Sequence, residues 1–208
     1  MIEKFYKKYV RPNLANVVSF LGLFAAILML VTILTHPEKI LLIMIFGSFG
    51  FLTDFVDGRL ARKLGIESNF GSAIDRLKDK MLICPNLFAL VWQGRIFLNN
   101  LSLAFTIFTI SLVVFIIVLE ILLLIFWIIG VSKKLDVGAN KFGKAKMFCE
   151  CLVVIFWLAS VAFEKYLETP ILNSSIYLVD FTLAVAIFLA GGSLKNYWER
   201  YYPQKSSE

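Results

Sequence analysis

Four aspartates stand close together between two apolar stretches of the 208-residue chain: Asp54, Asp57, Asp75 and Asp79. The first two are three residues apart and the last two are four apart, so on a helix each pair lies on one face. If the two helices pack side by side, the four carboxylates converge and need a cation among them. Mg²⁺ and Mn²⁺ take such oxygen ligands, and a site of this size could hold two ions, which suits displacement at phosphorus.

The same stretch also carries enough positive charge to neutralise the aspartates without a metal. Residues 54–79 contain five acidic side chains when Glu67 is included, and five basic ones, namely Arg59, Arg62, Lys63, Arg76 and Lys78. A salt-bridged cytoplasmic loop is therefore the alternative to a metal site, and charge alone does not separate the two.

Small residues beside the aspartates favour a site that binds a nucleotide. Gly58 directly follows Asp57, Ala61 lies one helical turn later, and Gly71 lies on the facing helix. Small side chains at these positions open a groove in which a flat group, such as a nucleobase, can approach the backbone. Arg62, one turn past Gly58, is placed to hold a phosphate through two hydrogen bonds.

The elements that must position these residues are membrane helices. The chain is 59% apolar with a mean hydropathy of +0.80, whereas soluble domains are roughly 45–50% apolar. Uncharged runs near or above ~18 residues predict an all-α integral membrane protein, with one domain over residues 1–208. We expect six transmembrane helices, at 14–35, 38–57, 77–93, 101–130, 147–166 and 170–192. A short interfacial helix over Met1–Val10 is expected before them, with a frayed basic terminus as the alternative.

The basic residues are distributed unevenly along the chain, whose net charge is +6. Nearly all of them precede the first span, separate the second from the third and the fourth from the fifth, or follow the sixth. By the positive-inside rule, both termini and the aspartates are expected on the cytoplasmic side of a cell membrane. The positive charge therefore indicates topology and attraction to anionic lipids, and no nucleic-acid partner is expected.

Glu120 is the single ionisable residue of the fourth predicted span. A carboxylate in an apolar run is costly in lipid, so Glu120 is expected to face the interior of the helix bundle or a wet cavity.

The spacing Asp54-x2-Asp57-Gly58-x2-Ala61-Arg62-x8-Gly71-x3-Asp75-x3-Asp79 resembles the complete signature of the CDP-alcohol phosphotransferases. The resemblance implies a six-helix membrane enzyme, usually a homodimer, that transfers a substituted phosphate from a CDP-linked donor to an alcohol and releases CMP. It implies Mg²⁺ or Mn²⁺ as cofactor, two ions in all, and assigns a role to each signature residue. Asp54, Asp57 and Asp75 would be metal ligands, Asp79 the general base and a contact of the second metal, and Gly58, Ala61, Arg62 and Gly71 the walls of the CDP pocket.

Outside the signature, three segments are similar to the phosphatidylglycerolphosphate synthase and cardiolipin synthase branch of that family. They are "RPNLANVVS" near the start, "FGSAID" before the last aspartate, and "NKFGKAK" over Asn140–Lys146. The resemblance implies CDP-diacylglycerol as donor, with membrane lipids as partners, and glycerol 3-phosphate as the favoured acceptor.

Three departures from that branch leave the acceptor open. Ser19, Leu119 and Trp127 stand where arginines are common in the branch. Lysines in residues 133–146 could bind an acceptor phosphate instead, or could serve topology alone. Phosphatidylglycerol (giving cardiolipin), inositol phosphate or another alcohol is therefore the alternative acceptor. A non-catalytic membrane scaffold or a transporter is the alternative from another class.

Overall fold

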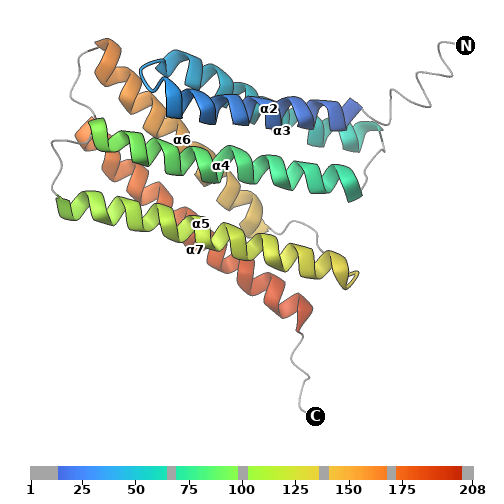
Figure 1. Ribbon diagram of the computed structural model, residues 1–208. Coiled ribbons are helices and arrows are strands. Elements are labelled where there is room, and N and C mark those ends of the chain that lie inside the picture. The colour runs from blue at the N-terminus through green and yellow to red at the C-terminus, as the bar shows by residue number, and fades with distance from the viewer. Residues whose placement is uncertain (1–13, 65–68, 98–102, 136–140, 168–171, 203–208) are drawn as a thin grey trace, which may run out of the picture. The chain divides into compact units, whose positions relative to one another are not determined.

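The computed structural model describes residues 14–64, 69–97, 103–135, 141–167 and 172–202. Every regular element in these ranges is a helix, which confirms the all-α prediction (Figure 1). The helices are α2 (Leu14–Thr35), α3 (Ile40–Leu64), α4 (Asn69–Phe97), α5 (Leu103–Ser132), α6 (Lys141–Leu167) and α7 (Leu172–Tyr201). The interfacial helix predicted over Met1–Val10 lies outside the described residues.

Four helices in the described ranges are long and apolar enough to cross a membrane: Asn16–Thr35, Leu103–Ser132, Lys141–Leu167 and Ser175–Tyr201. A shorter apolar helix covers Ile40–Asp54, which is the first part of α3. Large apolar side chains also point outward, with Leu103 and Phe188 each 76% exposed. Water-soluble monomers rarely expose contiguous apolar patches of more than a few hundred Å², whereas such a surface suits lipid chains.

The two helices that carry the aspartates extend past the predicted spans. α3 continues to Leu64, past the predicted span 38–57, and α4 begins at Asn69, before the predicted span 77–93, as expected from the placement of Gly71 on a helix. Hydropathy marks where a helix leaves apolar surroundings, not where its hydrogen bonding ends. The added residues include Arg62 and Lys63, and both residue types have good helix propensity.

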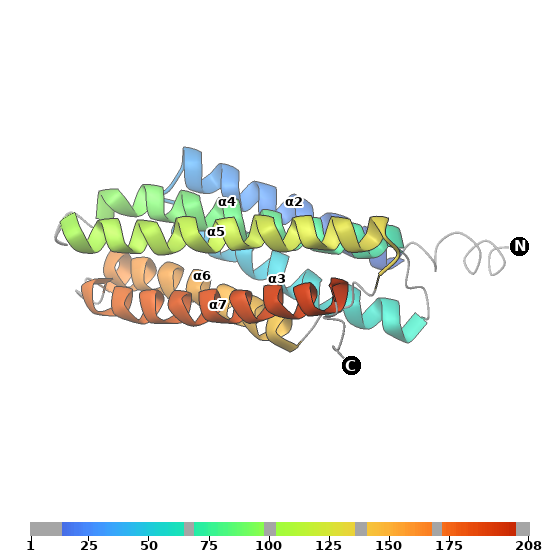
Figure 2. The same ribbon diagram turned by 90° about the horizontal axis from the view of Figure 1, so that it is seen from below.

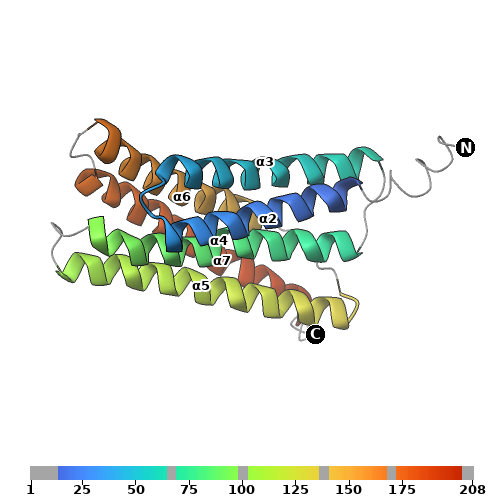
Figure 3. The same cartoon turned by 45° about the horizontal axis from the view of Figure 1, so that its top comes forward.

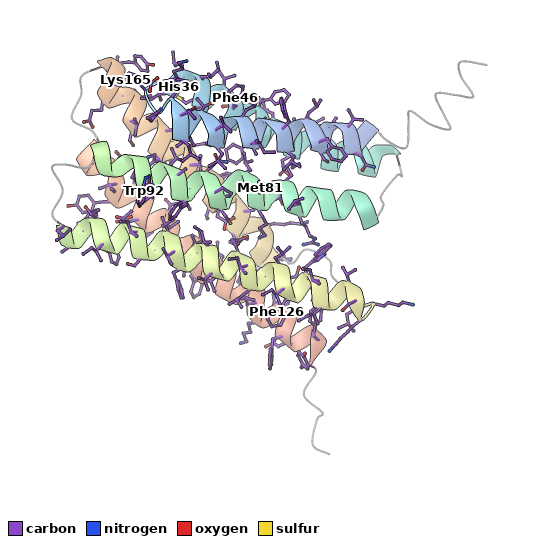
Figure 4. The ribbon with its side chains drawn as sticks, in the orientation of Figure 1. His36, Phe46, Met81, Trp92, Phe126 and Lys165 are labelled. Atoms are coloured by element: carbon purple, nitrogen blue, oxygen red, sulfur yellow. The ribbon has the colours of Figure 1, made fainter. Side chains whose placement is uncertain are left out.

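The first compact unit covers Met1–Gln93 and contains α2, α3 and most of α4. A tight turn joins α2 to α3, in which the His36 N–H donates to the Thr32 carbonyl at 2.8 Å and the Lys39 N–H to the His36 carbonyl at 2.9 Å. Figure 4 shows His36 at this turn. The two helices then lie side by side, with α4 alongside them (Figure 3).

Pro85 lies inside α4 without ending it. A proline lacks an N–H, so the carbonyl four residues earlier, that of Met81, loses its helical donor. The fully buried Asn86 side chain supplies one instead, because its Nδ2 lies 3.2 Å from the Met81 carbonyl oxygen and 2.9 Å from that of Leu82. The same amide lies 3.5 Å from the Ala26 carbonyl oxygen of α2, which ties α4 to that helix.

Glycines let the helices of this unit approach closely. A Cβ built on Gly50 of α3 would lie 2.9 Å from Cδ1 of Leu82 on α4, and one on Gly47 would lie 3.2 Å from Sδ of Met29 on α2. A larger residue at Gly50 would push Leu82 away, so the absence of a side chain there sets how near α3 and α4 come.

The second compact unit covers Gly94–Glu208 and contains α5, α6 and α7. α7 packs against both α5 and α6, and Figure 2 shows α6 and α7 side by side. In the first part of α7, the buried apolar residues recur every three or four positions and so form one helix face: Ile176, Val179, Leu183, Ala186 and Ala190. Near the other end of α7, the ring of Phe126 on α5 lies 6.2 Å from those of Trp198 and Tyr201 (Figure 4).

Candidate active site on α3 and α4

The predicted helical positions of the aspartates are confirmed, because all eight signature residues fall within α3 or α4. Two contacts show that these helices run antiparallel: Asp54 pairs with Lys78, and Gly50, one turn earlier on α3, faces Leu82, one turn later on α4. The carboxyl end of α3 and the start of α4 therefore form a hairpin.

Asp54 and Asp79 lie equally far from the ends of the helices that form the hairpin. Asp54 lies ten residues before Leu64, where α3 ends, and Asp79 lies ten residues after Asn69, where α4 begins. At 1.5 Å per residue, each of these two stretches is ~15 Å long, so Asp54 and Asp79 come to the same level. By the same measure, the positions of Asp57 and Asp75 along their helices lie at one level, ~10 Å from the helix ends.

An ion pair joins the two helices at the level of Asp54. The Lys78 ammonium lies 2.8 Å from Oδ1 of Asp54, and the exposed fractions of the two side chains are 0% and 23%. A fully buried ammonium requires a charged or strongly polar partner, and Asp54 supplies it. This contact is one that the salt-bridged alternative predicts.

Gly22 of α2 leaves the space through which the Lys78 side chain extends to Asp54. A Cβ built on Gly22 would lie 2.8 Å from Cδ of Lys78 and would clash with Oγ1 of Thr53. Thr53 is held in place because its hydroxyl donates to the Gly50 carbonyl at 2.7 Å. Three helices therefore build the buried surroundings of the ion pair, and α2 contributes a residue that has no side chain.

Asp79, the predicted general base, is half-buried, and its Oδ1 atom is enclosed. The remaining signature residues lie on α3 or α4, but their side chains are outside the part of the chain that the structure describes: Asp57, Gly58, Ala61, Arg62, Gly71 and Asp75. Their roles as metal ligands and as walls of a CDP pocket stay predictions.

The donors that the structure describes fit a divalent ion. Asp54 and Asp79 offer hard carboxylate oxygens, which Mg²⁺ and Mn²⁺ prefer. The Lys78 ammonium is a positive charge that the site already holds against Asp54. Within the described side chains, no group of three or more His, Cys, Asp or Glu could hold a metal, and Asp57 and Asp75 are not among those side chains.

A second cluster of charges lies in the other unit, where Lys146 of α6 contacts two glutamates. Its ammonium pairs with Oε1 of Glu120 on α5 and lies 3.5 Å from Oε2 of Glu150, one turn along α6. All three side chains are at least 93% buried. The prediction that Glu120 faces inward is confirmed. Among the lysines of residues 133–146, Lys146 is thus engaged by carboxylates, whereas the others with described side chains are exposed.

Asp180 forms a third buried polar contact. It lies on α7, and its Oδ2 accepts a hydrogen bond of 3.0 Å from the Thr109 hydroxyl of α5. Asp180 is 6% exposed. The contact is a polar link between α5 and α7 within a mostly apolar helix interface.

Sequence reasoning did not single out Lys78, Glu150 or Asp180. The sequence signal for Asp180 was the same as for Glu120, a carboxylate within an apolar run. Glu150 was recognisable as the i+4 partner of Lys146, a spacing that brings side chains together on a helix. Lys78 carried no separate signal, because it is one of five basic residues in a stretch with five acids.

Two comparisons with known proteins cover most of the chain. A family model described as CDP-alcohol phosphatidyltransferase matches residues 12–191. A curated relative, the CDP-diacylglycerol–glycerol-3-phosphate 3-phosphatidyltransferase of Mycoplasma genitalium, is 33% identical over 138 residues, which are 64% of this chain and 53% of the relative. The chain thus spans about half the length of the curated relative that it matches.

Proposed function

Because the chain belongs to the CDP-alcohol phosphatidyltransferase family, we propose that it transfers a phosphatidyl group from CDP-diacylglycerol to an alcohol and releases CMP. The reaction would belong to phospholipid biosynthesis. The observation that carries the proposal is the α3–α4 hairpin, in which the complete signature lies on two antiparallel helices with Asp54 and Asp79 at one level.

The family's chemistry assigns a role to each part of this hairpin. Asp54, Asp57, Asp75 and Asp79 would hold two Mg²⁺ or Mn²⁺ ions, which would stabilise charge on the pyrophosphate and make CMP a better leaving group. Asp79 would accept the proton of the attacking hydroxyl, a task that suits a partly buried carboxylate.

The neighbouring small residues would receive the nucleotide. Gly58, Ala61 and Gly71 would leave room for CDP against the backbone, and the planar guanidinium of Arg62 would hold one of its phosphates with two hydrogen bonds. The acyl chains of the donor would lie among the helices, which places the reaction at the membrane interface.

Glycerol 3-phosphate is the acceptor that we propose, supported by the name of the Mycoplasma genitalium relative. Within residues 133–146, Lys133, Lys134, Lys141 and Lys144 are exposed and are the candidates to bind its phosphate, with a role in topology alone as the alternative. Lys146 is already neutralised by Glu120 and Glu150, so it is the least suited of the group to do so.

We further propose that all six helices span a cell membrane, with α3 and the apolar half of α4 adding to the four long apolar helices. Both termini and the aspartates would face the cytoplasm, and Met1–Val10 would lie in the interface. The family's usual assembly makes a homodimer the proposed state, with residues 1–208 forming one domain.

An acceptor panel tests the proposed function. Purified protein with CDP-diacylglycerol and Mn²⁺ is offered glycerol 3-phosphate, phosphatidylglycerol, inositol phosphate or inositol, and the lipid product is identified by mass. We expect CMP release and phosphatidylglycerolphosphate with the first acceptor. A different product mass would correct the acceptor alone, and no CMP release with any acceptor would favour a non-catalytic scaffold.

A further inference from the structure

We propose that the Lys78 ammonium is a built-in cation of the aspartate site, one that competes with a divalent ion for Asp54 and so weakens the affinity of the site for that ion. The inference rests on the proposed function, in which Asp54 is a metal ligand. It assigns a role in metal affinity to Lys78, which occupies one of the three unspecified positions between Asp75 and Asp79 in the signature.

The ion pair has the features of a built site. The ammonium is 2.8 Å from Oδ1 of Asp54, and no part of the Lys78 side chain reaches solvent. The side chain passes the backbone of Gly22, where an added Cβ would lie 2.8 Å from its Cδ. A lysine on the surface could move away from a carboxylate at little cost, whereas the Lys78 side chain is fully buried and packs against the backbone of Gly22.

The competition follows from charge and distance. A divalent ion on Asp54 would lie ~2.1 Å from a carboxylate oxygen, and hence within a few ångströms of the Lys78 ammonium. Like charges at such a separation repel strongly in partly desolvated surroundings. The ion must therefore either displace the ammonium from Asp54 or bind close to it against this repulsion. Both lower the affinity of the site for the ion.

The test compares Mn²⁺ binding by the full-length protein and two neutral variants of similar side-chain length, Lys78→Met and Lys78→Gln. Protein in detergent micelles is equilibrated with Mn²⁺, and the free ion is measured by electron paramagnetic resonance. We expect both variants to bind Mn²⁺ at least ~10-fold more tightly than the wild type, which corresponds to about 1.4 kcal/mol. Lys78→Gln keeps a polar partner for Asp54 and serves if Lys78→Met does not fold.

Lys39→Met is the matched control, because it removes a lysine of the same unit. Lys39 is exposed and stands 15 residues before Asp54 (54 minus 39), which is ~22 Å along a helix. We expect its Mn²⁺ affinity to equal that of the wild type.

Each result separates this inference from the proposed function. If the wild type binds Mn²⁺ and neither Lys78 variant binds it more tightly, the competition is refuted and the proposed function stands. If neither the wild type nor the variants bind Mn²⁺, the metal-dependent function fails together with the inference. Tighter binding by Lys39→Met as well would show a general charge effect and would also overturn the assignment to Lys78.

Discussion

The buried charges of Lys146, Glu120 and Glu150 provide a prediction whose size can be worked out. Two carboxylates share one ammonium, so these three side chains together carry one surplus negative charge. Lys146→Met removes the shared cation and leaves two buried carboxylates beside each other. Glu150→Gln removes the surplus charge and keeps the pair between Lys146 and Glu120. We therefore expect the first change to be far more destabilising than the second.

The magnitudes follow from Coulomb's law with an effective dielectric constant of ~20. At 3.5 Å, Lys146 attracts Glu150 by roughly 5 kcal/mol. Because both glutamates contact the same ammonium, their carboxylates lie no more than about 7 Å apart, which opposes this attraction by roughly 2 kcal/mol or more. Burial of the Glu150 charge costs several kcal/mol more, so its attraction to Lys146 is nearly cancelled by its repulsion from Glu120 and its loss of hydration. Glu150→Gln should change the unfolding free energy by less than ~1 kcal/mol, whereas Lys146→Met should lower it by ~3–5 kcal/mol.

The assay is the unfolding free energy of each purified variant in mild detergent, followed by tryptophan fluorescence during titration with a denaturing detergent. Lys195→Met is the control, since Lys195 is 77% exposed and its pair with Glu199 at 3.8 Å should contribute at most ~0.5 kcal/mol. If Glu150→Gln costs as much as Lys146→Met, the surplus-charge reasoning is wrong and the cluster acts as one indivisible network.

The other variants address the helix contacts and the proposed base. Gly22→Ala should lower the unfolding free energy by ~1–3 kcal/mol through overpacking, whereas Gly191→Ala, where a Cβ meets nothing within 4 Å, should not lower it; equal effects would refute the close approach. Asp79→Asn should abolish CMP release while CDP-diacylglycerol binding persists in a lipid-binding assay; lost binding would contradict its role as base. Thr109→Val should cost ~1–3 kcal/mol because the buried Asp180 loses its donor, and Thr109→Ser, which keeps the hydroxyl, should restore most of this stability.

The hairpin of aspartates was predictable from sequence because its determinants are local. Spacings of three and four fix the helix face on which each pair of aspartates lies. The common level of Asp54 and Asp79 follows from the helix bounds at Leu64 and Asn69, which the structure supplies. The inward position of Glu120 was predictable for another local reason, the cost of a lone carboxylate among apolar residues.

The partners of these carboxylates were not predictable, because they depend on packing between elements distant in sequence. Several basic residues near Asp54 could have paired with it by charge alone. The choice of Lys78 depends on Gly22, which lies on another helix and leaves room for the lysine. The predicted spans cover only the apolar part of each helix, because polar residues continue the backbone hydrogen bonding as far as Leu64 and from Asn69 on.

The central claim is that the aspartates of α3 and α4 support metal-dependent phosphatidyl transfer. Its most direct test is CMP release from CDP-diacylglycerol and glycerol 3-phosphate by the purified protein, measured with Mn²⁺, after chelation by EDTA, and after Mn²⁺ is restored. We predict that release falls to background on chelation and recovers with Mn²⁺. Release that continues undiminished in EDTA would contradict the claim.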